Sequence, residues 1–201
     1  MYVQVCRMDR RLWPLMMTRR KRNDTGEFRM LYFSYGSNMS LPRLRARAPS
    51  AQSVAIASLP GHVLRFHKVG NDGTGKCDAL FTGDQSDYVL GVVFDIAVID
   101  KSRLDQTEGL GYGYAEKQVE VLTDEGRKPV TRMYVAIRID ASLKPYLWYR
   151  THVLAGCREH NFPDEYVRAI EAVKTIPDID TARCERELGV YHSVTMHTDS
   201  Q

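Results

Sequence analysis

The pattern of hydrophobic and polar positions separates an irregular beginning from a regular remainder. Residues 1–29 are rich in arginine and keep no hydrophobic period. From residue 30 the run MLYFSY predicts a strand, and MSLPRLRARAPS predicts a short helix. Ser40 is expected to cap this helix, Pro42 suits its first turn, and Pro49 marks its end. We therefore expect the regular structure to begin near residue 30.

Apolar runs and alternation predict several more strands. ASLPGHVLRFHKV contains a turn followed by a strand, and YVLGVVFDI is a continuous apolar run of strand length. KQVEVL and VTRMYVAIRI flank the turn-forming stretch TDEGRKP, which predicts a hairpin. Met133, Val135, Ile137 and Ile139 alternate with the residues between them and are expected to form the buried face of its second strand.

Helical patterns are short in the first half and longer near the end. VIDKSRLDQTEG predicts a helical turn that ends at Gly109, where a left-handed cap is natural. SLKPYLWYRTHVLAGCREH and FPDEYVRAIEAVKTI predict two later helices, the second with Pro163 near its first turn. Many strands with helices collected late indicate an α+β domain with a small, curved, mixed or barrel-like sheet.

This organisation predicts one domain with an extension on each side. Residues 1–29 are expected to be a disordered extension, or the product of a start codon assigned too early, with Met30 as the natural start. Residues 30–178 are expected to form the domain. The polar residues 179–201 are expected to form a weakly ordered tail.

Composition and charge exclude several classes of function. The 201 residues carry a net charge of +3, but residues 1–30 hold eight basic and three acidic residues, so the remainder is nearly neutral and gives no indication of nucleic-acid binding. The four cysteines are scattered singly and the six histidines are dispersed, which suits a reducing compartment and indicates no metal site. No apolar run approaches the length of a membrane span, and we expect a cytoplasmic protein without membrane contact.

Two glycine-rich stretches imitate nucleotide-binding motifs without meeting their requirements. GNDGTGKC, residues 70–77, ends in Cys77 where a phosphate-binding loop needs a hydroxyl group. The following CDALFTGD predicts a strand and a turn where such a loop would open a helix, so a hairpin loop is favoured. GLGYGY lacks the third glycine of a dinucleotide fingerprint and is interpreted as a loop.

Three features are not explained by packing alone: YGSN at a strand end, Glu108 before a glycine, and a supply of tyrosines. Gly36 allows a sharp turn whose free backbone N–H groups form an anion or oxyanion site, although a plain capping turn explains the same residues. A single glutamate is usually a solvated surface charge. A carboxylate held among Gly, Leu and Tyr residues is partly desolvated, however, and suited to moving a proton near neutral pH.

Four stretches, taken in order, resemble the gamma-glutamylcyclotransferase family. They are LYFSYGSNM, GVVFDI, LDQTEG followed closely by a tyrosine, and YRTHVLAGCREHNFPDEY, and together they span about residues 30–175. The resemblance implies a compact β-barrel flanked by helices and suggests a homodimer. It also implies an enzyme that needs no cofactor or metal and converts a γ-glutamyl amino acid into 5-oxoproline and the free amino acid.

The resemblance also implies roles for individual residues. Glu108 would be the acid/base residue, and the stretch around Gly36 and Ser37 would contact the glutamyl group through its backbone. A tyrosine that follows Glu108, either Tyr112 or Tyr114, would line the pocket. The substrate-binding residues expected on this basis are Tyr32, Phe33, Ser34, Tyr35, Gly36, Ser37, Asn38, Tyr114, Tyr134 and Tyr149.

The reaction explains why no nucleophile motif is needed, because the substrate's own α-amine attacks its γ-carbonyl carbon. YGSN favours γ-glutamyl amino acids, whereas related branches with YGSL act on glutathione and those with YGTL on γ-glutamylamines. Two alternatives stay open at this point. One is a protein that binds γ-glutamyl ligands without turnover, and the other is a cyclotransferase for γ-glutamylamines or a carrier-bound γ-glutamyl group.

Overall fold

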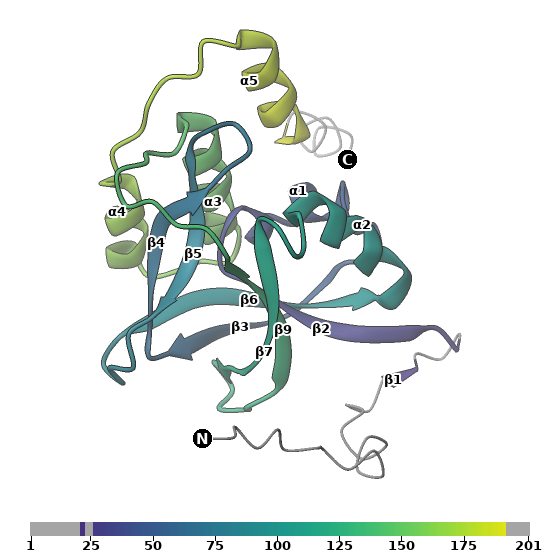
Figure 1. Ribbon diagram of the computed structural model, residues 1–201. Helices are drawn as coiled ribbons and strands as arrows, with labels where there is room; N and C mark the ends of the chain where they lie inside the picture. Colours follow the sequence, from purple (N-terminus) through teal and green to yellow (C-terminus); the bar gives the residue numbers. More distant parts are fainter. Residues whose placement is uncertain (1–20, 23–25, 192–201) are drawn as a thin grey trace, which may run out of the picture.

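The computed structural model describes residues 21–22 and 26–191, and most of the extension predicted over residues 1–29 lies outside them. Within the described residues, the main sheet has the strand order β7-β9-β2-β6-β3-β8, with β1 paired to β2 (Figure 1). A second sheet is the hairpin β4–β5. The strands are β1 Lys21–Arg22, β2 Phe28–Ser34, β3 Gln52–Pro60, β4 His62–Val69, β5 Gly75–Phe81, β6 Tyr88–Ala97, β7 Tyr114–Glu120, β8 Leu122–Thr123 and β9 Val130–Ala136.

Strand β2 lies in the middle of the sheet and leads into the YGSN turn. It pairs antiparallel with β6, where Tyr32 lies opposite Phe94, and parallel with β9, where Tyr32 lies opposite Arg132. The other pairs of the main sheet are antiparallel, so the predicted mixed sheet is confirmed. The sheet curls strongly in Figure 1, and its closure into a barrel stays a prediction.

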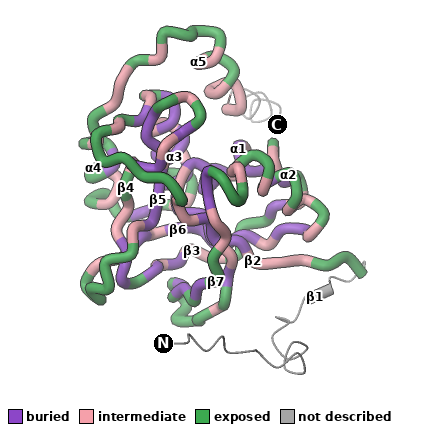
Figure 2. The backbone as a smooth tube through the Cα atoms, in the orientation of Figure 1, coloured by how far each residue is buried: buried purple, intermediate pink, exposed green. Residues whose placement is uncertain are grey.

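The central strands β2, β6 and β9 contribute a large part of the core. Figure 2 shows buried backbone along β6 where it crosses the middle of the molecule. Phe33, Phe94, Ile96 and Met133 are fully buried there, together with Leu104 of the following helix. β6 has neighbours on both sides and packed residues on both faces, which is why its sequence reads as a continuous apolar run and not as an alternation.

The helices gather at two places. In Figure 1, α1 and α2 lie at one end of the sheet, and α3 and α4 lie beside the β4–β5 hairpin. Among the described residues no helix is long and apolar enough to cross a membrane. The helices and 3₁₀ turns are η2 Ser37–Met39, α1 Leu41–Arg45, α2 Val98–Glu108, α3 Leu147–Glu159, α4 Asp164–Glu171, α5 Thr181–Leu188 and η3 Gly189–Tyr191.

Two local predictions were wrong. Ser40 stands at the N-cap of α1 but makes no capping hydrogen bond, and Glu159 of α3 accepts the free N–H of Leu41 at 3.1 Å. In the β7–β9 hairpin, Ile137 and Ile139 are 47 % and 55 % exposed. Strand β9 ends at Ala136, so the alternation no longer places side chains in the core beyond that point.

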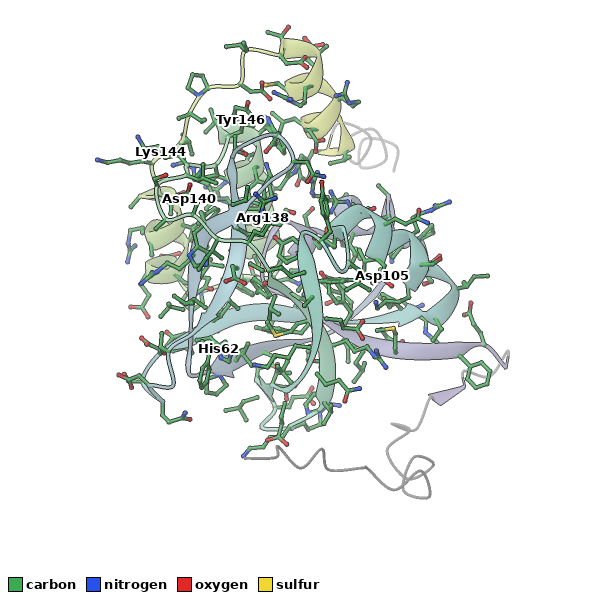
Figure 3. All side chains as sticks on the ribbon, in the orientation of Figure 1. His62, Asp105, Arg138, Asp140, Lys144 and Tyr146 are labelled. Carbon is green, nitrogen blue, oxygen red and sulfur yellow. The ribbon has the colours of Figure 1, made fainter. Side chains whose placement is uncertain are left out.

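The β4–β5 hairpin is held by the segment that connects β9 to α3. Arg138, Asp140, Lys144 and Tyr146 mark the path of this segment along the hairpin in Figure 3. Its backbone contacts the hairpin at three points: Val69 N–H donates to Arg138 O, Asp140 N–H to His67 O, and Gly75 N–H to Lys144 O, at 2.9, 2.7 and 3.0 Å. The hairpin is therefore fixed along its length although it is not part of the main sheet.

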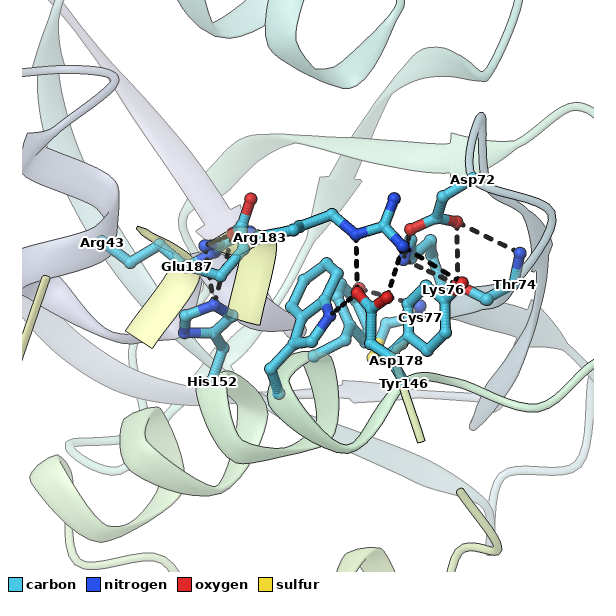
Figure 4. Close-up of polar contacts among 12 residues, drawn as sticks. Arg43, Asp72, Thr74, Lys76, Cys77, Tyr146, His152, Asp178, Arg183 and Glu187 are labelled. Atoms are coloured by element: carbon cyan, nitrogen blue, oxygen red, sulfur yellow. Dashed lines mark hydrogen bonds and ion pairs between the residues drawn. The ribbon is translucent and has the colours of Figure 1, made fainter. Parts of the chain in front are cut away.

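The segment expected to be a weakly ordered tail contains α5. Figure 4 shows Arg43 of α1 between His152 of α3 and Glu187 of α5. Arg43 Nη1 donates to Glu187 Oε2 at 2.7 Å and to His152 Nε2 at 2.8 Å. How strongly the tail is held stays a prediction, but α5 is connected to the domain through the fully buried His152.

This connection makes the stability pH-dependent. Burial lowers the pKa of His152 from 6.5 to about 4, so between these two pH values the unfolded chain binds a proton that the folded chain does not. Between pH 7 and pH 5 we expect the free energy of unfolding to fall by about 2 kcal/mol on this account. Urea unfolding at pH 7 and at pH 5 measures this difference in the free energy of unfolding. In a His152→Gln variant the free energy of unfolding should fall less between the two pH values. An undiminished fall would show that His152 is not the group responsible.

Candidate active site

The YGSN turn passes close to β5. Gly36 connects β2 to η2, and a Cβ atom added to it would lie 2.9 Å from Cys77 Cβ and 3.7 Å from Tyr149 Oη. Glycine is therefore required by the close approach of these residues. Within the described part of the chain, the backbone N–H groups of Gly36, Ser37 and Asn38 donate no hydrogen bond. The turn therefore presents three backbone donors without a protein partner among the described residues, and their use by a ligand stays a prediction.

Glu108 is the last residue of α2. Gly109 ends the helix in the left-handed conformation, with φ +67°, as predicted. The side chain of Glu108 is 15 % exposed and points to the YGSN turn, where its Oε1 accepts from Asn38 Nδ2 at 2.9 Å. Arg47, which follows α1, donates from Nη1 to the same oxygen at 3.3 Å. The carboxylate thus has two donors and an adjacent positive charge.

Asn38 connects this carboxylate to its surroundings. Its Nδ2 group also contacts Tyr32 Oη at 3.2 Å, and its Oδ1 accepts from Arg47 Nη1 at 2.7 Å. Both ends of the buried amide are therefore occupied, which fixes the orientation of the side chain. As a result, Glu108, Asn38 and Arg47 form one connected group at the edge of the pocket.

Tyrosines form the walls of the pocket. Tyr149 Oη accepts from Cys77 N–H at 3.0 Å, Tyr114 Oη donates to Cys77 O at 2.8 Å, and Tyr134 Oη donates to Asp105 Oδ1 at 2.7 Å. Burial raises the pKa values of these phenols, so they stay protonated at neutral pH. The lining residues are Tyr32, Ser34, Tyr35, Gly36, Ser37, Asn38, Cys77, Glu108, Tyr114, Tyr134 and Tyr149.

The pocket settles the choice between two tyrosines and omits one expected residue. Tyr114 is buried and lines the pocket, whereas Tyr112 is 64 % exposed and does not. Phe33 was expected among the substrate-binding residues, but its side chain is fully buried in the core, where its ring would be 2.5 Å from a Cβ added to Gly91. It alternates with Tyr32 and Ser34, which face the pocket.

The pocket contains a thiol but no activated nucleophile. Cys77 is buried against Gly36, and burial raises the pKa of its thiol far above neutral pH. No histidine lines the pocket to activate it. Over the described residues, no cluster of three or more His, Cys, Asp or Glu side chains is arranged to hold a metal ion. Glu108 is the one carboxylate among the described residues that line the pocket.

Known proteins are similar to this chain in sequence. Residues 88–170 match the AIG2-like family. The chain is 31 % identical over 166 residues to a gamma-glutamylcyclotransferase of Homo sapiens, covering 79 % of this chain and 85 % of the relative. The chain belongs to the gamma-glutamylcyclotransferase family. A gamma-glutamylcyclotransferase of Mus musculus is also 31 % identical, over 72 % of this chain and 78 % of its own.

A comparison with solved structures supports the same family. A solved structure described as gamma-glutamyl cyclotransferase superposes with a TM-score of 0.72 at 25 % identity, over 80 % of this chain and 98 % of that one. The family and the α+β fold expected from the sequence are therefore confirmed, and the protein is an enzyme of the cyclotransferase type.

Sequence reasoning missed two residues of this candidate site: Cys77, which lines the pocket, and Arg47, which contacts Glu108 at its edge. Arg47 was one arginine in the run RLRARAP, and no signal in that run separates it from its neighbours. Cys77 was examined only as the defect in a phosphate-binding motif. Both reach the pocket through contacts between distant parts of the chain, Arg47 with Glu108 and Cys77 with Gly36 and Tyr149.

Proposed function

We propose that the enzyme converts a γ-glutamyl amino acid into 5-oxoproline and the free amino acid in the pocket between β2, β5 and α2. One observation carries this proposal: the largely buried carboxylate of Glu108 shares a pocket with three backbone N–H groups that have no partner among the described residues. A proton acceptor and an oxyanion site are what an intramolecular aminolysis needs from a protein.

The proposed reaction begins at the α-ammonium group of the glutamyl part. Glu108 takes one of its protons, and the resulting amine attacks the γ-carbonyl carbon to close a five-membered ring. The amide C–N bond then breaks as Glu108 returns this proton to the departing nitrogen, and the second proton that the attacking nitrogen loses on becoming the neutral lactam N–H is transferred to the released amine, which leaves as an ammonium group. One bond forms, one breaks, and no external water, nucleophile or redox partner is consumed. The absence of an activated nucleophile in the described pocket is consistent with this chemistry.

The turn at Gly36 supports the step in which negative charge develops. As the amine attacks, the γ-carbonyl oxygen becomes an oxyanion, and the N–H groups of Gly36, Ser37 and Asn38 are available to stabilise it. Each well-placed donor contributes on the order of 3 kcal/mol to the transition state. Protonated Tyr32, Tyr114 and Tyr149 form the pocket walls, exclude water from the carboxylate and hold the flexible glutamyl chain in a folded form.

Arg47 is proposed as a positioning residue that acts through Glu108. It donates from one nitrogen to both Asn38 and Glu108, so it fixes the carboxylate relative to the turn. In Arg47→Met we expect kcat to fall about tenfold to a hundredfold while KM changes less than about threefold. Arg47→Lys should recover part of kcat, because it restores a donor and a charge.

Arg45→Met is the matched control, since Arg45 is exposed and lies two positions before Arg47 on the same segment. Steady-state kinetics with γ-glutamyl-alanine measure all three variants. A loss in Arg47→Met that is confined to KM would instead make Arg47 a substrate-binding residue.

Purified enzyme incubated with γ-glutamyl amino acids, glutathione and γ-glutamylamines, with 5-oxoproline read by mass spectrometry, tests the proposed function. We expect product from the γ-glutamyl amino acids at the highest kcat/KM. Product from γ-glutamylamines at an equal or higher kcat/KM would contradict the substrate class. No product from any compound, with folded protein, would contradict the proposed function.

A further inference from the structure

Two lysines of the β4–β5 hairpin lie beside the pocket. Lys68 and Lys76 are directly opposite one another in the strand register, so their side chains lie on the same face. Lys68 Nζ lies 4.5 Å from the ring centroid of Tyr114, and Lys76 Nζ lies 4.7 Å from that of Tyr149. Both rings line the pocket. The hairpin therefore brings two ammonium groups to the outer side of the pocket wall.

Lys76 is already paired. Figure 4 shows its ammonium group beside Asp72 and Thr74. Nζ lies 2.7 Å from Asp72 Oδ2 and 2.8 Å from Thr74 Oγ1. Both partners lie in the loop that connects β4 and β5. The positive charge of Lys76 is therefore paired within this loop.

Lys68 differs from Lys76 in having no such partner. The residue is 6 % exposed, yet over residues 26–191 its ammonium group has no hydrogen bond and no ion pair. Burial lowers its pKa, and the negative charge of Glu108 opposes that effect. The ammonium group of this mostly buried residue keeps three N–H donors from which the carboxylate of a ligand can accept. Lys68 is therefore a cation next to the pocket that contacts the ring of Tyr114 but has no hydrogen-bond acceptor among the described residues.

Gly113 lies between Lys68 and the end of α2 and leaves room for the ammonium group. A Cβ atom added to Gly113 would lie 3.0 Å from Lys68 Nζ and 3.0 Å from the backbone oxygen of Glu108. The ammonium group thus lies beside the C-terminal end of α2, the helix that carries the carboxylate. Arg47 contacts the carboxylate directly, but its Nη1 group is occupied by Asn38 and Glu108.

We propose that Lys68 binds the carboxylate of the leaving amino acid and so selects substrates whose scissile nitrogen carries a neighbouring carboxylate. This inference rests on the proposed function. The departing nitrogen must come within hydrogen-bond reach of Glu108 to receive its proton. In a γ-glutamyl amino acid, a carboxylate lies only two bonds from that nitrogen, and it would be repelled by Glu108 unless a cation lay between them. Lys68 is the cation at that place.

A matched pair of substrates tests this assignment. γ-Glutamyl-alanine and γ-glutamyl-ethylamine differ only in the carboxylate on the leaving group. The readout is the ratio of their kcat/KM values. We expect wild type to favour γ-glutamyl-alanine, and Lys68→Met to reduce the ratio at least about tenfold, the size typical of a lost charge-assisted hydrogen bond. Lys68→Arg should retain part of the preference, and Lys117→Met, at an exposed lysine of β7, should retain all of it.

Two outcomes would overturn the assignment. If Lys68→Met lowers turnover of both substrates equally, Lys68 contacts the glutamyl part or supports the fold. If the ratio does not change, Lys68 does not recognise the carboxylate.

A binding measurement separates this inference from the proposed function. Calorimetric titration of Glu108→Gln with the two compounds needs no turnover. Tighter binding of γ-glutamyl-alanine that is lost in the Glu108→Gln, Lys68→Met double variant supports Lys68 even if wild type releases no 5-oxoproline. Equal binding of the two compounds to Glu108→Gln overturns the assignment of Lys68, whatever the turnover of wild type.

Discussion

Glu108→Gln is expected to give a folded protein whose release of 5-oxoproline is slower by a factor of about 10² to 10⁴, the usual loss when a general acid/base is removed. The amide oxygen of glutamine can still accept from Asn38 and Arg47, so the hydrogen bonds that order the pocket are retained. What the variant lacks is a group that can take a proton from the substrate ammonium.

The fall should appear in kcat, with KM changed less. Circular dichroism and the thermal midpoint show whether the variant is folded, and Glu165→Gln, at an exposed glutamate of α4, is the matched control. Turnover of the folded Glu108→Gln variant within fivefold of wild type would remove Glu108 from the mechanism.

Gly156→Ala is expected to lower the thermal midpoint by about 6–12 °C, which corresponds to overpacking of about 3 kcal/mol in a chain of this size. Gly156 lies on the face of α3 that packs against η2. A Cβ atom there would lie 2.5 Å from Met39 Cβ and 2.8 Å from the backbone nitrogen of Ser40. Backbone atoms cannot rotate away, so α3 and the turn must separate.

The same substitution should impair catalysis, because η2 contains Ser37 and Asn38. At a temperature where the variant is fully folded, kcat/KM is expected to fall at least about tenfold if the donors to the oxyanion move. Gly189→Ala is the matched control, since Gly189 has a negative φ and no atom within 4 Å of an added Cβ. An unchanged thermal midpoint in Gly156→Ala would show that α3 and η2 accommodate the added methyl group without loss of stability.

Local chemistry explains why part of this structure could be predicted from the sequence. Gly109 ends α2 because only a residue that tolerates positive φ suits that position, and this signal is contained in a few adjacent residues. The buried run of β6 and the later helices are similarly local patterns. The YGSN turn and Glu108 were identified as candidates because each departs from what packing requires.

The rest depends on contacts between segments far apart in the chain. Ser40 could not be recognised as an unused cap, because Glu159 comes from α3, more than a hundred residues later. Arg47 and Lys68 look like ordinary surface residues in the sequence, and only the folded chain brings them to Glu108 and Tyr114. Phe33 was grouped with its neighbours in a continuous stretch, although alternation along β2 directs it to the opposite face.

The central claim is that the glutamyl α-amine, and not water, attacks the γ-carbonyl carbon. The most direct measurement is turnover of γ-glutamyl-alanine in H₂¹⁸O, with all products identified by mass spectrometry. The account predicts equal amounts of unlabelled 5-oxoproline and alanine, with no glutamate formed by the enzyme. Glutamate that carries ¹⁸O in its γ-carboxylate would show that the pocket directs hydrolysis and would contradict the account.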